Sequence, residues 1–327
     1  MGQRWLIRVA SHRRHGGGHV ARCAVLASAL VDVGADVVVQ LDADSPEAAG
    51  ILAPRGLSCS EDTPTGPIDG IVLDGYELME KEAAALARRA PLVAIDDFLD
   101  PPHVAALVVN CALHLEGDHV GTTPALLGPR FALVDPRFSA LPTRDHTGPV
   151  RHVLVTMGRI DAANLTSSAL DALATADTTV TVVASRTSPA YEAVRRKVDG
   201  RGGAVRLETD VTDMAPLLAE ADFVIGAGGV SLVERVAAGM PSLTLLLADN
   251  QSLFIEGAAR LGVTIDGSDM NTNDIAVALE AAFADGNARD EMARAGRRTI
   301  DGRGPARVAE RLVAMAGARP DKRQAAV

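Results

Sequence analysis

Short apolar runs alternate with longer segments of helical periodicity along the chain. Five runs rich in Val, Ile and Leu occur in the first half, at residues 5–10, 36–42, 69–75, 91–97 and 105–111. Such runs are typical of strands buried on both faces of a parallel sheet. Between the first two runs, apolar residues recur at helical spacing from His19 and stop at Gly34, a suitable helix C-cap. This succession predicts a βαβ unit.

A second series of runs begins after residues 139–151, a polar stretch with two prolines that we interpret as a linker. Its six apolar runs lie at residues 152–158, 179–185, 204–210, 223–228, 242–248 and 263–267. A chain of 327 residues is long enough for two domains. We therefore predict an α/β protein with two Rossmann-like domains, residues 1–145 and 146–316, that face each other across a cleft. The polar tail, residues 317–327, is expected to be frayed.

Composition narrows the class of partner. A net charge of -10 and an aromatic content of 3% leave neither the basic face nor the stacking surface of a nucleic-acid-binding protein. No apolar stretch approaches the roughly 18 residues of a membrane span, and the N-terminus lacks the pattern of a secretory signal. Three cysteines without a CxxC spacing are typical of a reducing compartment. We expect a cytoplasmic monomer that binds a small molecule, without nucleic acid, membrane insertion, metal or cofactor.

Open parallel sheets bind their ligands at the carboxyl ends of strands. The run at 223–228 leads into a glycine-rich loop and then a helix, whose first N–H groups and positive dipole end suit a phosphate. No GK[ST] sequence follows, which favours a sugar nucleotide over ATP. The expected nucleotide-binding residues are Gly226, Ala227, Gly228, Gly229, Ser231, Glu234 for the ribose, and Met214 near the base. The alternative is a turn that only packs a helix against the sheet.

His19 lies at the junction of the first predicted strand and the first predicted helix, directly after three glycines. An imidazole can take a proton from water or a hydroxyl near neutral pH, which makes His19 a candidate base. The alternative is a histidine that serves only as a helix cap. His12 and His15 are interpreted as solvated loop residues.

These motifs resemble those of a known family. The segments "RVASHRRHGGGHVARC", "LDGYE", "IDDF", "VTMGRIDAANLT" and "GAGGVSLVERVAAGMPSLTLLLADNQ" are similar, in order and spacing, to those of the UDP-diacetamido-trideoxy-altrose hydrolase family of pseudaminic acid biosynthesis. The resemblance covers roughly residues 5–265 and implies the GT-B fold, which the lipid II glycosyltransferase shares. It also implies metal-independent attack of water at the anomeric carbon of a UDP-sugar, with inversion.

The resemblance assigns roles to particular residues of this chain. His19 would activate the water, and Tyr76 and Asn250 would line the sugar and water site as further catalytic residues. The remaining expected substrate-binding residues are Gly18, Arg22, Asp97, Arg159 and Gln251. For the carboxylates of "IDDF", Asp96 and Asp97, the alternative to a role on the sugar is a loop cap.

Three positions depart from the family's pattern. Ala10 stands where the family usually has an aspartate, and Gly75 replaces the histidine of an Asp-His-Tyr sequence. Arg159 replaces the second glycine of a Gly-Gly turn and is either an added diphosphate ligand or a solvated charge. The loss of polar groups at Ala10 and Gly75 predicts a different amino sugar, or a weak or lost hydrolase activity.

Three functions are therefore compatible with the sequence. The first is a nucleotide-sugar hydrolase, the second is a GT-B glycosyltransferase that uses a UDP-amino sugar donor, and the third is a sugar-nucleotide-binding module without turnover. An apolar patch or an acceptor-sized groove would favour the transferase. The sequence of the first half shows no basic-apolar stripe suited to a lipid acceptor.

Overall fold

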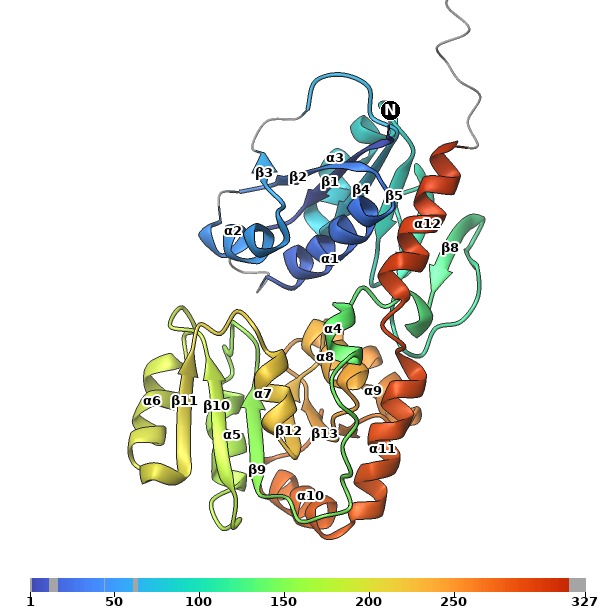
Figure 1. Ribbon diagram of the computed structural model, residues 1–327. Helices are drawn as coiled ribbons and strands as arrows, with labels where there is room; N and C mark the ends of the chain where they lie inside the picture. The colour runs from blue at the N-terminus through green and yellow to red at the C-terminus, as the bar shows by residue number, and fades with distance from the viewer. Residues whose placement is uncertain (1, 12–16, 44, 61–63, 318–327) are drawn as a thin grey trace, which may run out of the picture. The chain divides into compact units, whose positions relative to one another are not determined.

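The computed structural model describes residues 2–11, 17–43, 45–60 and 64–317. The chain forms two compact units (Figure 1). Unit 1 contains the chain up to Leu133 and again from Arg303, and unit 2 is Val134–Gly302. Residues 134–145, assigned to the first domain from the sequence, pack with unit 2, and the last helix returns to unit 1. The interpretations of His12, His15 and the frayed tail from residue 318 lie outside the described residues.

Unit 1 is built on a sheet with the strand order β3-β2-β1-β4-β5-β6-β8-β7. Its strands are β1 (Arg4–Val9), β2 (Asp36–Leu41), β3 (Cys59–Ser60), β4 (Gly70–Asp74), β5 (Leu92–Ile95), β6 (Ala105–Asn110), β7 (His119–Val120) and β8 (Thr123–Leu127). Neighbouring strands run parallel except for β7 and β8. The five runs of the first half correspond to β1, β2, β4, β5 and β6.

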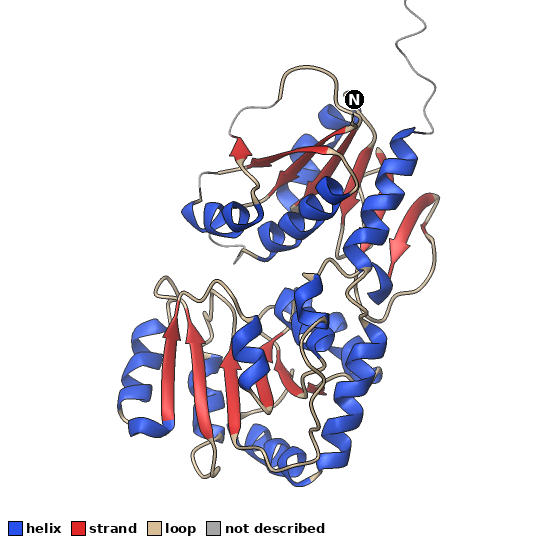
Figure 2. Ribbon diagram, viewed as in Figure 1, coloured by secondary structure: helices blue, strands red, loops and turns tan. Residues whose placement is uncertain are grey.

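Helices cover both faces of this sheet (Figure 2). They are α1 (Gly18–Asp32), α2 (Pro46–Leu52), α3 (Tyr76–Ala87) and α12 (Gly304–Gly317), with short turns η2 (Ala53–Arg55) and η3 (Pro129–Phe131). One face packs on α1 and α12, where Val308 and Leu312 are fully buried. The other face packs on α3 through Leu78 and Met79. The last helix therefore completes the core of unit 1.

Unit 2 has a second parallel sheet, with the order β11-β10-β9-β12-β13-β14. Its strands are β9 (His152–Thr156), β10 (Thr179–Ala184), β11 (Val205–Thr209), β12 (Phe223–Ala227), β13 (Ser242–Leu245) and β14 (Ile265–Asp266). Its helices are α4 (Pro136–Ser139), α5 (Leu165–Ala172), α6 (Tyr191–Asp199), α7 (Ala215–Glu220), α8 (Val230–Ala238), α9 (Ser252–Arg260), α10 (Thr272–Ala284) and α11 (Gly286–Thr299), with turns η4 (Gly202–Ala204) and η5 (Asp249–Gln251). Each of the six runs of the second half contains one strand.

Arginine side chains attach the linker of residues 139–151 to unit 2. Arg144 donates to the carbonyls of Ala219 and Ala221 at 2.8 and 2.6 Å. Arg297 donates to three linker carbonyls at 3.0 to 3.2 Å. These hydrogen bonds hold the linker against unit 2. No helix in the described ranges is long and apolar enough to cross a membrane.

Candidate functional site

An ion-pair cluster lies at the carboxyl end of β4 in unit 1, centred on Asp74, which is fully buried. Arg22 on α1 donates to both oxygens of this carboxylate at 2.7 Å. Burial alone would raise the pKa of Asp74, but the charge of Arg22 and the hydrogen bonds from Arg22 and His19 outweigh burial and hold that pKa far below its usual range. Asp74 is therefore a carboxylate at neutral pH. Asp74 is not among the site residues predicted from the sequence, although an acidic residue that ends an apolar strand is a usable signal.

His19, on the first turn of α1, contacts the same carboxylate. Its Nδ1 lies 2.6 Å from Oδ1 of Asp74 and 3.1 Å from Nη2 of Arg22. An unprotonated Nδ1 would set its lone pair against the carboxylate, so we assign the proton to Nδ1, which donates to Asp74. Proton transfer then falls to Nε2, the arrangement in which a carboxylate fixes the tautomer of a general base.

A second carboxylate extends the cluster. Arg22 binds both oxygens of Asp97 at 2.8 and 3.0 Å, and the hydroxyl of Tyr76 donates to Asp97 at 2.9 Å. The ring of Tyr76 also meets the ring of His19 edge-on, with centroids 5.5 Å apart. Four of the predicted residues therefore form one network, and Gly18 precedes His19 directly. Asp96, by contrast, accepts the N–H of Phe98 at 3.0 Å, the contact of a loop cap.

Two of the departures from the family pattern touch each other. Gly75 has a φ of 140°, and a Cβ built there would lie 2.5 Å from the Cβ of Ala10. A side chain at Gly75 therefore requires a change at Ala10 as well as an unfavourable backbone conformation. Neither position supplies a polar group to the cluster.

The glycine-rich loop of unit 2 connects β12 to α8. Gly229 has a φ of 78°, and Gln251 packs against the loop, so that a Cβ at Gly228 would lie 3.0 Å from the Cβ of Gln251. Ser231 donates to the carbonyl of Ala227 at 3.4 Å. Since the first N–H groups of a helix lack partners within the helix, the start of α8 presents donors suited to an anion.

Beneath this loop lies Arg235, which is not among the site residues predicted from the sequence. Its side chain is only 1% exposed and donates to the carbonyl of Ala227 and to Oγ1 of Thr244, both at 3.0 Å. Burial lowers the pKa of Arg235 to about 10, so the side chain is still a cation at neutral pH. Arg235 follows the buried Leu232 by three residues, which places it on the apolar face of α8. This spacing could have indicated a buried arginine.

The other predicted residues of unit 2 lie on separate loops. Met214 is the N-cap residue of α7, and Asn250 is exposed in the turn η5. Arg159 is half-buried on the loop that follows β9. Glu234 is half-buried on α8, next to Arg235. The structure thus describes two clusters, the His19 network in unit 1 and the glycine loop with Gln251 in unit 2.

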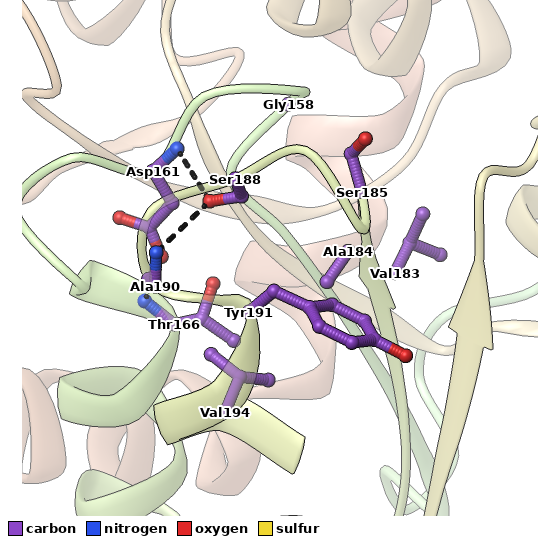
Figure 3. Close-up of a pocket in the computed structure, with 10 residues that line it drawn as sticks. All are labelled: Gly158, Asp161, Thr166, Val183, Ala184, Ser185, Ser188, Ala190, Tyr191 and Val194. Atoms are coloured by element: carbon purple, nitrogen blue, oxygen red, sulfur yellow. Dashed lines mark hydrogen bonds between the residues drawn. The ribbon is translucent and has the colours of Figure 1, made fainter.

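A small pocket lies after β9 and β10 in unit 2 (Figure 3). Asp161 accepts the N–H groups of Leu165 and Thr166 at 2.8 and 2.9 Å and so caps α5. The hydroxyl of Ser188 accepts the N–H groups of Asp161 and Ala190 (Figure 3). These side chains form hydrogen bonds with the backbone of the loops that follow β9 and β10. None of the predicted nucleotide-binding residues lines the pocket.

Comparison with known proteins gives one curated relative of moderate similarity. No protein-family model matches the chain. The spore coat polysaccharide biosynthesis protein SpsG of Bacillus subtilis (strain 168) is 29% identical over 197 residues. The match spans 58% of this chain and 58% of SpsG, a little over half of each.

Solved structures resemble the chain over nearly its whole length. The MnaA–UDP co-structure from S. aureus has a TM-score of 0.70 at 13% identity, covering 97% of this chain and 98% of that one. MurG from Acinetobacter baumannii has a TM-score of 0.63 at 14% identity, covering 95% and 99%. The spinosyn rhamnosyltransferase SpnG complexed with thymidine diphosphate has 0.64 at 15% identity, also covering 95% and 99%. The predicted GT-B fold, with two Rossmann-like units, is confirmed.

Proposed function

We propose that this protein is an enzyme that breaks the bond between the anomeric carbon of a sugar and the diphosphate of a nucleotide sugar. The observation that carries the proposal is the buried Asp74 that fixes the tautomer of His19. Structures of the same fold in complex with UDP (MnaA) and with thymidine diphosphate (SpnG) support a nucleotide ligand. The proposal assigns the base to unit 1 and the nucleotide to the glycine loop of unit 2.

The chemistry follows from these assignments. An acceptor oxygen attacks the anomeric carbon while the bond from that carbon to the diphosphate oxygen breaks. The acceptor proton passes to Nε2 of His19, and Asp74 stabilises the resulting imidazolium. The electron pair of the broken bond leaves with the diphosphate, whose growing negative charge the N–H groups at the start of α8 stabilise. Attack from the face opposite the leaving group gives inversion.

For the acceptor, we propose a hydroxyl group of another molecule, which makes the protein a GT-B glycosyltransferase. Phe98 is 54% exposed and Leu99 is 39% exposed, on the loop that follows β5. The ring of Phe98 packs on Tyr76 at 4.8 Å between centroids, and Tyr76 in turn contacts His19. An exposed apolar surface this close to the base suits an acceptor with an apolar part. The similarity to SpsG, a spore coat polysaccharide biosynthesis protein, supports the same proposal.

The second candidate is the hydrolase, in which water takes the place of the acceptor. It is favoured because His19 and Tyr76, the residues that the family resemblance assigns to the water site in unit 1, belong to one network. In this candidate the sugar is an acetamido-trideoxy sugar of the kind used in surface glycans. Ala10 and Gly75 leave its binding site without two polar groups that the family usually has.

One experiment separates these candidates. The purified protein is incubated with UDP- and TDP-linked amino sugars and EDTA in water enriched in heavy oxygen. Parallel reactions contain or lack hydroxyl acceptors, and the products are identified by mass spectrometry. A transferase releases the nucleoside diphosphate only with an acceptor and forms an unlabelled glycoside. A hydrolase releases a labelled sugar without an acceptor. Release of nucleotide that is equally fast in the His19→Ala variant would contradict the proposal.

A further inference from the structure

The guanidinium of Arg235 is buried and, among the residues that the structure describes, has only neutral hydrogen-bond acceptors. Its side chain starts on the second turn of α8 and folds back under the loop that precedes the helix. Nη2 donates to the carbonyl of Ala227 and to Oγ1 of Thr244, and Nη1 lies 3.4 Å from the hydroxyl of Ser231. Its Nε is buried without a hydrogen-bond partner in the described part of the chain. All three acceptors are neutral groups.

No carboxylate of the described residues forms an ion pair with Arg235. Burial lowers the pKa of Arg235, and the attraction of the neighbouring Glu234 offsets this only in part. Thr244 is itself occupied with Thr264, whose hydroxyl lies 2.7 Å away. A buried cation that neutral acceptors alone satisfy costs free energy relative to an apolar residue of similar size. A function in the bound state would explain why the chain keeps this residue.

The position of the guanidinium indicates that function. Gly226 leaves room for it, since a Cβ at Gly226 would lie 2.6 Å from Nη1. The hydrogen bond to Ala227 draws that carbonyl toward Arg235, beneath the loop. The carbonyl of Ala227 is therefore bound by the guanidinium on the inner side of the loop. The N–H groups at the start of α8 are available to bind an anion.

We propose that Arg235 is the buried counter-charge of the nucleotide's diphosphate. The inference rests on the proposed function, because it places the diphosphate at the glycine loop. Arg235 acts through the loop as a positioning residue: it supplies positive charge from below and holds the backbone that binds the anion. In this low-dielectric layer the attraction is screened less than on the surface. Binding of the diphosphate thereby offsets the cost of burying the guanidinium.

The test compares a charged and an uncharged ligand of the same base. Calorimetric titration of the full chain with UDP and uridine, and in parallel with TDP and thymidine, gives the diphosphate preference as a ratio of affinities. In Arg235→Met this ratio should fall about tenfold or more, with the nucleoside affinity unchanged. Arg235→Lys should keep most of the preference and Arg235→Gln should lose it. The melting temperature without ligand should stay the same or rise in Arg235→Met, because the desolvated charge is gone.

Arg289 supplies a matched control in the same unit. It is also buried, at 3% exposed, and it also donates to backbone carbonyls, those of Ala282, Phe283 and Gly148. Arg289→Met should change the melting temperature and leave the UDP-to-uridine ratio as it is.

The outcomes separate the inference from the proposed function. A wild-type protein that binds neither UDP nor TDP would overturn the proposed function. A wild-type protein that binds the diphosphate, with a preference that Arg235→Met and Arg235→Gln retain, would overturn the inference alone. Equal loss of nucleotide and nucleoside affinity would also overturn it and make Arg235 a purely structural residue. If Arg235→Met does not fold, the contrast between the Lys and Gln variants decides the question.

Discussion

At the scale of single residues, Asp74 determines the chemistry of its neighbours. It accepts from Arg22, holds the proton of His19 on Nδ1, and lies 3.3 Å from the thiol of Cys23. Burial opposes the charge of Arg22, but the carboxylates of Asp74 and Asp97 outweigh burial and raise the pKa of Arg22 well above its usual value. Arg22 and Asp74 therefore form an ion pair before any ligand binds.

Replacing His19 by alanine tests its role as the base. Turnover should fall by roughly a hundredfold or more, the usual scale for a lost general base. UDP affinity should remain nearly unchanged, because His19 is assigned to proton transfer. His119→Ala, at an exposed histidine of the same unit, is the control and should leave turnover unchanged. Steady-state kinetics and calorimetry measure both quantities, and near-normal turnover of His19→Ala would remove His19 from the mechanism.

The depressed pKa of Asp74 predicts a pH-dependent contribution to stability. Because the pKa is lower in the folded than in the unfolded chain, this contribution is fully present above about pH 4, the ordinary value for aspartate. It is lost progressively as the pH falls below that value. Urea unfolding of wild type and Asp74→Asn should give a constant difference in unfolding free energy from pH 7 to 5 and a shrinking one toward pH 3. A difference that persists unchanged at pH 3 would contradict the assignment.

At the scale of elements, the turn between β4 and α3 places Tyr76 directly after Gly75. The φ of 140° at Gly75 and its contact with Ala10 leave no room for a side chain. This turn therefore fixes the start of α3, whose first residue, Tyr76, meets the ring of His19 edge-on.

Substituting Gly75 by alanine should destabilise unit 1 by about 1 to 3 kcal/mol, from backbone strain and the clash with Ala10. The double variant Ala10→Gly with Gly75→Ala should recover the part due to the clash and keep the part due to strain. Chemical denaturation of the two single variants and the double variant measures the coupling between the positions. Strictly additive effects would show that the two residues do not compete for space.

The buried strands and the long helices were predictable from the sequence because their own periodicity marks them. The strands β3 and β7 were not, since each has two residues and depends on pairing with its neighbour. At the site, His19 and the glycine loop stood out by residue type. Asp74 at a strand end and Arg235 on an apolar helix face could be located from the sequence, but their roles could not, because a buried charge shows its role only through the partners that tertiary packing brings to it.

At the scale of the whole molecule, the chain passes from unit 1 to unit 2 after Leu133 and back after Gly302. The returning α12 contributes Val308, Ala309 and Leu312 to the core that α1 covers. Unit 1 is therefore assembled from two distant parts of the sequence, whereas unit 2 is continuous.

Truncating Leu312 to alanine should lower the stability of unit 1 by about 2 to 4 kcal/mol, because it leaves a cavity in that core. Hydrogen exchange followed by mass spectrometry should speed up in peptides of β1 and α1 and stay the same in peptides of β9 and β12. Val277→Ala, at an exposed position on α10, is the control and should leave both sets unchanged. Faster exchange throughout unit 2 in Leu312→Ala would contradict the division into two units.

Because α12 belongs to unit 1, the two units complete their folding at different times during synthesis. Synthesis proceeds from the N-terminus, so unit 2 has all its segments once Gly302 has emerged. At that moment the sheet of unit 1 has been available for longer, yet the apolar surface that α12 covers is still open to chaperones and to other nascent chains. Unit 1, which contains His19, is therefore the first unit to be synthesised and the last to complete its core.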